Sequence, residues 1–240
     1  MRKGRSVKIL CAMLLIAVCS VGVTNAREHK GTGQGCFYIG ASTVDVEKLN
    51  TSLRAFGYPE LSDRVMSMGG GGHAFINRLV IGGQGHALIS KSYDVIVRNV
   101  PYKTELTAGI GFFNVGYLLT PQSSLKVYPM FGIGGGGIEL SITEKQPPAF
   151  EQILQQPNRS THLSKAVLLV NVALGVDYFI VTQRDEEGVG GLVLGLELGY
   201  NLCPVTSGWS AEEIEITGGP DVGITGPYVR FKIGGGGKRK

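Results

Sequence analysis

The residues best placed to do chemistry are His162 and Ser164, which stand two positions apart. Because alternate residues of a β-strand point to the same side, a strand here would put both side chains on one face. A serine becomes a nucleophile when a histidine within hydrogen-bonding reach takes its proton, and a third group normally orients that histidine. Asp177, downstream of the pair, is the acidic residue considered for this third group. At about 3.3 Å per residue it lies much too far along the same strand to orient His162 unless a loop intervenes, so the pair alone does not establish a hydrolase.

The other residues with chemical potential favour structural roles. His73, Gln84 and His86 fall on one face of a predicted hairpin, but its register separates the two histidines by four pair positions, too far for one metal ion. Three glycine-rich runs lack the Gly-Lys-Ser/Thr sequence of a phosphate loop, so we expect them to ease strand twist and curvature. These runs lie at 69–72, 82–85 and 134–137. We therefore expect no cofactor and no metal.

Hydrophobic alternation indicates that strands position these residues. Large apolar side chains alternate with small or polar ones over 166–180 and again over 192–202, which is the period of a β-strand. In two other segments the apolar phase changes parity, near Asn114 and across 134–137. A bulge or bend is the natural interpretation of such a change.

The pattern predicts an all-β fold of eight antiparallel strands whose connections alternate long and short. The strands are expected at 36–43, 64–76, 79–90, 102–119, 124–142, 164–181, 189–203 and 224–235. The long connections are 44–63, 91–101, 143–163 and 204–223, and the short ones are 77–78, 120–123 and 182–188. Short turns at one end and long loops at the other are typical of an up-and-down transmembrane β-barrel. An even strand number places both termini at the periplasmic end.

Two local signals refine this expectation. Asn77-Arg78 is a plausible two-residue turn, because asparagine tolerates the positive φ that such turns require. The first long connection is expected to carry one short helix over 45–56, with apolar side chains recurring at helical spacing along one stripe. Asp45 or Thr43 can cap this helix, and Gly57 ends it.

The N-terminus is typical of an exported protein. Basic residues within 2–8, an apolar run over 9–23 and a small residue at Ala26 match a secretory signal peptide. A membrane anchor and lipoprotein cleavage at Cys19 are the alternatives. The expected organisation is a signal peptide at 1–26, a linker at 27–35, a barrel domain at 36–235 and a basic tail at 236–240. Cys36 and Cys203 would then lie at opposite ends of the barrel, and we predict two unpaired thiols.

Composition excludes some classes of function. The chain has 240 residues, 18% of them charged and 43% apolar, with a net charge of +4 and basic clusters at its termini. This apolar content excludes a disordered chain. Without a basic stripe interleaved with aromatic residues, nucleic-acid binding is not expected.

With these strands in view, residues 36–235 resemble the small eight-stranded outer-membrane barrels of the OmpA and OmpX type. The resemblance is one of pattern and does not identify a subfamily. It implies that charged side chains pair inside the lumen, and the candidates on three successive strands are Asp177, Glu197, Arg230 and Lys232. One departure is the C-terminal end. Such barrels commonly end on an aromatic residue that the assembly machinery reads, whereas here Phe231 is followed by glycines and Lys238-Arg239-Lys240.

Three hypotheses of function follow. The leading one is a non-enzymatic barrel of the bacterial outer membrane, with lipid around it, a lumen filled by side chains and surface contacts made through its long loops. The second is a membrane-embedded, lipid-modifying hydrolase using His162 and Ser164, since outer-membrane lipid A deacylases resemble this arrangement of a His-x-Ser pair on one strand face. The third is a soluble periplasmic barrel of lipocalin type that binds an apolar ligand, in which the large apolar faces would point inward.

Overall fold

The structure is a computed structural model that describes residues 31–121, 124–145, 151, 160–184, 186, 188–211 and 214–239. The expected signal peptide lies outside the described residues. The strands are β1 (Gly31–Thr43), β2 (Arg64–Ile76), β3 (Leu79–Ile89), β4 (Tyr93–Val97), β5 (Val100–Tyr117), β6 (Leu125–Glu144), β7 (Ser160–Arg184), β8 (Gly188–Thr206), β9 (Ser210–Ala211), β10 (Ile214–Glu215) and β11 (Gly226–Arg239). The helix is α2 (Glu47–Ala55). Within the described residues, no helix is both long and apolar enough to cross a membrane.

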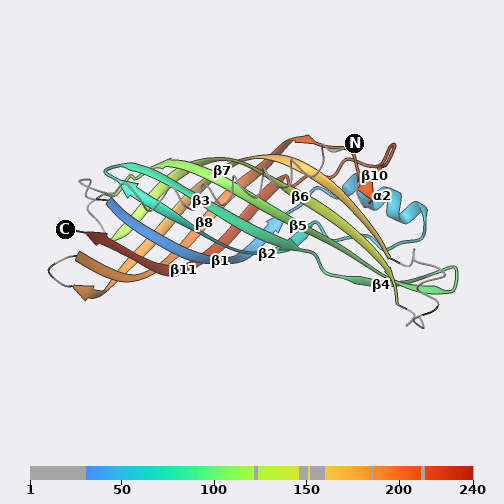
Figure 1. Ribbon diagram of the computed structural model, residues 1–240, viewed down its shortest axis with the longest axis horizontal. Helices are drawn as coiled ribbons and strands as arrows, with labels where there is room; N and C mark the ends of the chain where they lie inside the picture. The colour runs from blue at the N-terminus through green and yellow to red at the C-terminus, as the bar shows by residue number, and fades with distance from the viewer. Residues whose placement is uncertain are drawn as a thin grey trace.

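Eight of the strands close into a ring. The hydrogen-bonded order is β1-β2-β3-β5-β6-β7-β8-β11, and β11 pairs back with β1. Each ring strand is antiparallel to both neighbours, so the barrel is of the up-and-down type, as its sequence predicts (Figure 1). The predicted turn is confirmed too, since Asn77 has a φ of 57° and Ile76 pairs with Leu79.

The ring strands run past the expected barrel boundaries. β1 begins at Gly31, inside the expected linker, and β11 continues to Arg239, inside the expected basic tail. These ends pair with each other, as in Gly33 with Gly237. Their glycine and polar residues show no apolar alternation, but their backbones complete the ladder. Two of the long connections also carry short strands. β4 pairs with β5, and β9 pairs with both β7 and β10.

The expected bulge at the third glycine run is absent. β6 pairs with β5 and with β7 in unbroken register through residues 134–137. What changes is the side of the wall that carries large apolar residues: Phe131 and Ile133 point outward, 54% and 53% exposed, whereas Ile138 and Leu140 point inward, 1% and 2% exposed. The parity change therefore marks a change of environment on the two sides of a regular strand. Register shifts occur instead between β7 and β8.

We call this change of sides at residues 134–137 of β6 the crossover. Steric contact explains why glycine occupies it. A Cβ built on Gly134 would meet the carbonyl oxygen of Gly111, on the neighbouring strand, at 1.9 Å. No side chain fits in that space without a shift of the backbone.

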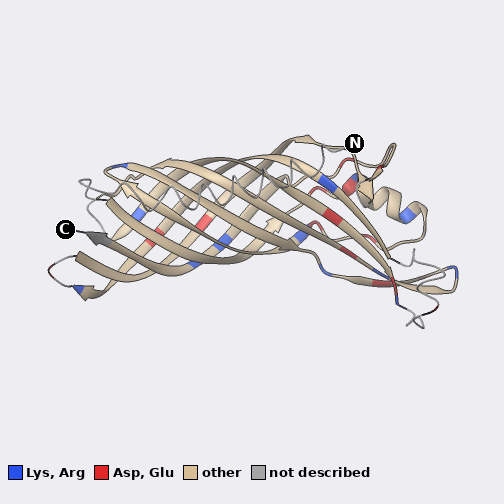
Figure 2. Ribbon diagram, viewed as in Figure 1, with Lys and Arg blue, Asp and Glu red and all other residues tan. Residues whose placement is uncertain are grey.

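The crossover divides the barrel into two parts. We call the part on the side of the short turns the girdle half, and the part on the side of the long loops the mouth half. In the girdle half, large apolar side chains cover the outer wall, including Phe37, Phe113, Phe131, Val172, Leu174, Leu194, Leu198 and Phe231. Figure 2 shows scattered charged residues along the girdle half, where Asp177, Glu197, Arg230 and Lys232 are buried, and more charged residues towards the mouth end. β11 ends at the girdle end, opposite to α2 and β4 (Figure 1).

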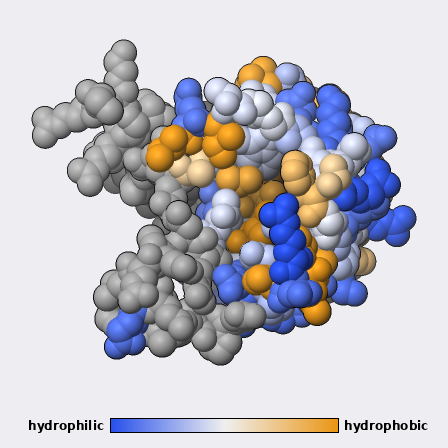
Figure 3. Space-filling view, turned by 90° about the vertical axis from the view of Figure 1, so that its right-hand side faces the viewer, coloured by the Kyte–Doolittle hydropathy of each residue, from blue (hydrophilic) through white to orange (hydrophobic). Residues whose placement is uncertain are grey.

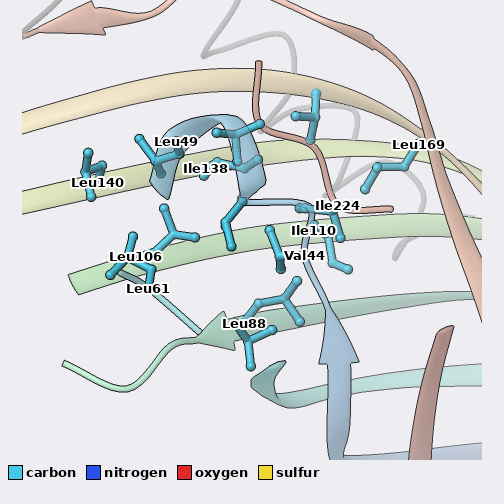
Figure 4. Close-up of a cluster of buried hydrophobic side chains, with 14 of the residues drawn as sticks. Val44, Leu49, Leu61, Leu88, Leu106, Ile110, Ile138, Leu140, Leu169 and Ile224 are labelled. Atoms are coloured by element: carbon cyan, nitrogen blue, oxygen red, sulfur yellow. The ribbon is translucent and has the colours of Figure 1, made fainter. Parts of the chain in front are cut away.

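The mouth half has an apolar interior. Its inward side chains pack against α2 and the last long connection in one cluster (Figure 4). The buried members include Leu49, Leu53, Leu88, Leu106, Ile110, Ile138, Leu140, Leu169, Trp209, Val222 and Ile224. The apolar stripe of the predicted helix thus fills the barrel mouth. Viewed from this end, apolar side chains lie in the middle of the described surface, with hydrophilic ones around them (Figure 3).

The helix begins later than predicted. It starts after Val46, which occupies the N-cap position and makes no side-chain capping hydrogen bond. Asp45 accepts one long hydrogen bond, 3.4 Å, from the backbone N–H of Glu47. The C-terminal prediction is more accurate, because the helix ends at Ala55 and Gly57 has a φ of 82°.

Candidate functional site

The girdle-half lumen holds one polar network around Asp177. Lys232 Nζ lies 2.5 Å from Asp177 Oδ1, and Gln34 Nε2 donates to Oδ2 at 2.5 Å. The Tyr128 hydroxyl also donates to Asp177 and accepts from Lys232 Nζ at 2.8 Å. Four ring strands, β1, β6, β7 and β11, contribute to this network, so it ties the walls together across the lumen.

A second network surrounds Glu197. Its Oε1 accepts from Tyr228 OH at 3.0 Å, from Gln84 Nε2 at 3.3 Å and from Arg230 NH1 at 3.4 Å. Arg230 also stacks over the Tyr228 ring at 3.9 Å. Both Glu197 and Arg230 are fully buried, and a buried charge is tolerated when an opposite charge and hydrogen bonds compensate it. The four charged residues named from the sequence thus form two ion pairs: Glu197 and Arg230 lie on the adjacent strands β8 and β11, whereas Asp177 and Lys232 lie on β7 and β11, on either side of β8.

The polar residues expected in the lumen lie there as well. His73, Gln84 and His86 are all buried, and a hydrogen bond of 3.0 Å joins His86 Nε2 to Gln84 Oε1. His73 and His86 stack edge-on against Tyr128 and Tyr38 respectively. Within the described residues, no group of three or more His, Cys, Asp or Glu side chains is arranged to hold a metal ion. Cys36 and Cys203 are free cysteines.

A second polar group lies on the outer wall of the mouth half. Its centre is His162, whose Nδ1 lies 2.8 Å from Glu139 Oε1 and 2.8 Å from Ser141 Oγ. His162 Nε2 lies 3.0 Å from Ser160 Oγ. The β6–β7 register sets Ser141 opposite His162 and Glu139 opposite Ser164. We call this set the outer cluster: Glu139, Ser141, Ser160, His162 and Ser164.

The outer cluster differs from the pair expected from the sequence. Ser164 shares the outward face with His162, but its Oγ is 3.0 Å from Ser210 Oγ on β9. Asp177 has the opposite parity on β7 and points into the lumen, where it pairs with Lys232. The acid beside His162 is Glu139, from the preceding strand. Strand period alone predicts that Ser160, two residues before His162, lies on the same face. The proximity of Glu139 cannot be predicted in this way, because it depends on the register between β6 and β7, which a long connection joins.

A polar anchor at Asp221 helps to hold the last connection against the mouth. Lys165 Nζ, inside the barrel, lies 3.4 Å from Asp221 Oδ1 in the last connection and 5.7 Å from the centre of the Trp209 ring. Trp209 Nε1 donates to the backbone oxygen of Pro220 at 2.7 Å. The hydrogen bond from Lys165, with the charges of Lys165 and Lys48, lowers the pKa of Asp221 below its ordinary value of 3.8.

A closed eight-stranded barrel with an apolar outer girdle and a charge-paired lumen is a small β-barrel of the membrane-spanning type. This is the architecture that the sequence pattern resembles. No family model matches the sequence, and no curated protein matches it.

Solved structures do show similarity. The attachment invasion locus protein Ail of Yersinia pestis is 13% identical, with 89% of this chain and 100% of that chain covered and a TM-score of 0.42. The outer membrane protein OprG from Pseudomonas aeruginosa is 13% identical, with 88% and 96% covered and a TM-score of 0.39. Neisserial surface protein A is 12% identical, with 88% and 96% covered and a TM-score of 0.34. Because such likeness is too low to transfer a role, we infer function from the chain's own residues.

Proposed function

We propose that this chain is an exported barrel of a bacterial outer membrane, and that its body is a closed support for surface contacts rather than a diffusion pore. The observation that carries the proposal is the crossover at the third glycine run. Outward apolar residues cover the girdle half, which suits surrounding lipid. Beyond the crossover, Glu139, Ser141 and Thr143 face outward on β6 instead, which suits water and headgroups.

The dimensions fit a membrane span. A tilted strand needs about 9–11 residues to cross the apolar layer. On β6 the outward residues are apolar or glycine from Leu125 to Gly137, and the first charged one is Glu139. On β7 they are apolar from Ala166 to Ile180. A soluble lipocalin-type barrel would bury these side chains inside, so the outward girdle contradicts that alternative.

Closure of the barrel supports a non-pore role. The two charge networks occupy the girdle-half lumen, and the apolar cluster with α2 fills the mouth. Eight-stranded barrels have interiors just wide enough for side chains to fill. The elements that remain for contact lie at the mouth end, among them the β4–β5 hairpin, where Ile96 is 73% exposed.

Two matched turns provide the test of placement. Asn77 and Asn99 both have positive φ in tight hairpin turns, φ 57° and 65°, but Asn77 joins β2 to β3 at the girdle end and Asn99 joins β4 to β5 at the mouth end. An epitope inserted after Asn99 should be labelled by antibody on intact cells. An epitope inserted after Arg78 should be labelled only after the outer membrane is permeabilised.

The gel behaviour of the protein is the companion measurement. A folded membrane barrel should need detergent for extraction and should change mobility between unboiled and boiled samples. Release of the folded protein into aqueous buffer would refute the membrane proposal. Labelling of the Arg78 insertion on intact cells would reverse the orientation.

A second candidate function rests on the outer cluster. The contacts of His162 with a carboxylate on one ring nitrogen and a serine on the other favour the lipid-modifying hydrolase over a purely structural histidine. Hydroxyl and imidazole side chains also form ordinary cross-strand pairs on solvated sheets, so the hydrolase needs a chemical test of its own.

A further inference from the structure

We propose that the outer wall of the barrel carries an acyl-ester hydrolase site in which Ser160 is the nucleophile, His162 the general base and Glu139 the acid that orients the histidine. The substrate class is the acyl ester of a membrane lipid. This inference rests on the proposed membrane placement and deepens the second candidate function.

The first support is the geometry around the imidazole. Glu139 Oε1 and Ser160 Oγ contact opposite ring nitrogens of His162, at 2.8 Å and 3.0 Å. A carboxylate at Nδ1 favours the tautomer in which Nδ1 donates its proton to Glu139. Nε2 then has a free lone pair to accept the proton of the Ser160 hydroxyl. Ser164 has no such contact, because its hydroxyl is engaged with Ser210.

The second support is a groove that adjoins the cluster on the same wall. It has a volume of about 520 Å³ and crosses β3, β5, β6 and β7. Its outward residues include Ala87, Gly109 and Gly137 in its body, with Glu139 and Ser164 at the cluster end. A Cβ on Gly109 would meet nothing within 4 Å, so the wall there is open. Below it, Phe113 and Ile133 stand outward, 45% and 53% exposed.

The position of the groove on the barrel wall favours a lipid acyl chain as its occupant. It lies at the crossover, between the apolar girdle and the first outward charge on β6. At this level of a bilayer, ester bonds lie between polar headgroups and apolar chains. A lipid whose chain lies along the small residues would present its ester towards Glu139, His162 and Ser160.

The reaction needs only the lipid and water. Ser160 Oγ attacks the ester carbonyl carbon, while His162 Nε2 takes the hydroxyl proton. The ester C–O bond breaks, and the leaving alkoxide takes that proton and departs as an alcohol. Water then attacks the acyl-serine and gives a proton to His162, which returns it to Ser160 as the fatty acid leaves. Glu139 stays ionised and stabilises the imidazolium. Thr143 Oγ1, 3.0 Å from Ser160 Oγ, can donate to the developing oxyanion.

The test uses the full chain folded in detergent and then in vesicles. A fluorophosphonate probe should attach to Ser160, as located by mass spectrometry. Fatty-acid release is measured in two arms, vesicles of phosphatidylethanolamine and the same vesicles containing lipid A, which distinguish a glycerophospholipid from a lipid A ester. Ser160→Ala should abolish labelling and, like His162→Gln, lower release by at least about 100-fold. Glu139→Gln should lower release with labelling still at Ser160.

Controls separate chemistry from folding. Ser52→Ala, on α2 and outside the cluster, should match the wild type. Gly137→Leu should fill the groove and slow release of long chains more than labelling by a small probe. Each variant must show the mobility change of a folded barrel.

The contrary results are distinct. A folded wild type that neither labels nor releases fatty acid would overturn the hydrolase and leave the membrane proposal standing. Labelling at Ser164 in place of Ser160 would overturn the nucleophile assignment. Absence of the mobility change in the wild type would instead refute the membrane barrel.

Discussion

At the scale of single residues, the girdle-half lumen depends on buried charges whose partners come from distant parts of the sequence. Arg230 pairs with Glu197 across adjacent strands and also donates to Ser67 Oγ on β2 at 3.2 Å. Each of these charges has lost its hydration shell, so the stability of the fold depends on the pairing of each charge with its partner. Removal of one partner leaves the other charge unpaired in the interior, which costs about 3–5 kcal/mol.

Glu197→Ala should therefore destabilise the folded barrel by about 3–5 kcal/mol. The measurement is the shift in the urea midpoint of unfolding from detergent micelles. Glu60→Ala is the matched control, because Glu60 pairs with Arg54 at 3.0 Å while both side chains are more than half exposed. Such a surface pair contributes about 0–1 kcal/mol. Equal midpoints for the two variants would contradict the importance of the lumen network.

Asp221 gives the mouth a pH dependence. Its pKa is lowered in the folded protein by the hydrogen bond from Lys165. A carboxyl with a depressed folded pKa stabilises the fold above its unfolded pKa, and that contribution is lost as the pH falls through the folded pKa. Trp209 is the single tryptophan and packs beside this anchor, so its emission reports on the connection.

The emission of Trp209 should shift to the red as the pH falls below 3.8, the ordinary pKa of an aspartate side chain, because the last connection loosens when Asp221 is protonated. Asp221→Asn should remove most of this pH dependence, since an amide does not titrate. A wild-type titration that the substitution leaves unchanged would assign the transition to another carboxyl.

At the scale of elements, strand period revealed most of the architecture and missed what depends on pairing partners. The alternation over 166–180 and 192–202 locates two strands, and Asn77-Arg78 locates a turn. Residues 31–35 and 234–237 carry no alternation, so their place in the ladder is visible only from β1–β11 pairing. The parity change in β6 predicts a bulge or bend, but the strand stays in regular register, because both of its faces change environment together. Glu139 beside His162 depends on the β6–β7 register, which no short turn fixes.

The helix is the element whose packing can be tested most directly. Leu53 is buried in the mouth cluster, whereas Phe56, near the end of the same helix, is 72% exposed. Leu53→Ala should destabilise the docking of α2 by about 2–5 kcal/mol, because it leaves a cavity among apolar neighbours. Hydrogen exchange of the α2 amides should quicken accordingly. Phe56→Ala should leave that exchange unchanged, and similar exchange in the two variants would contradict the proposed packing.

At the scale of the whole molecule, two different closures lie in series along one barrel. The mouth half is closed by apolar packing of α2 and the last connection, and the girdle half by ion pairs and hydrogen bonds. The same crossover that exchanges the two faces of β6 separates these closures. It also places the outer cluster at the boundary of the apolar girdle. The same change of faces therefore sets where the two closures meet, where the proposed membrane span ends and where the proposed ester site lies.

Two closures in series predict the ion conductance of the barrel. The wild type in a planar lipid bilayer should show no steady conductance, because either closure alone blocks the path. Replacement of both 44–63 and 207–223 by short glycine-serine linkers should open only the mouth, because both elements that close it are removed. Asp177→Ser, Glu197→Ser, Arg230→Ser and Lys232→Ser together should open only the lumen, because both ion pairs are removed. Steady conductance should appear when both changes are combined in a barrel that still shows the folded mobility. Conductance equal to the combination in either single change would show that one closure alone seals the protein.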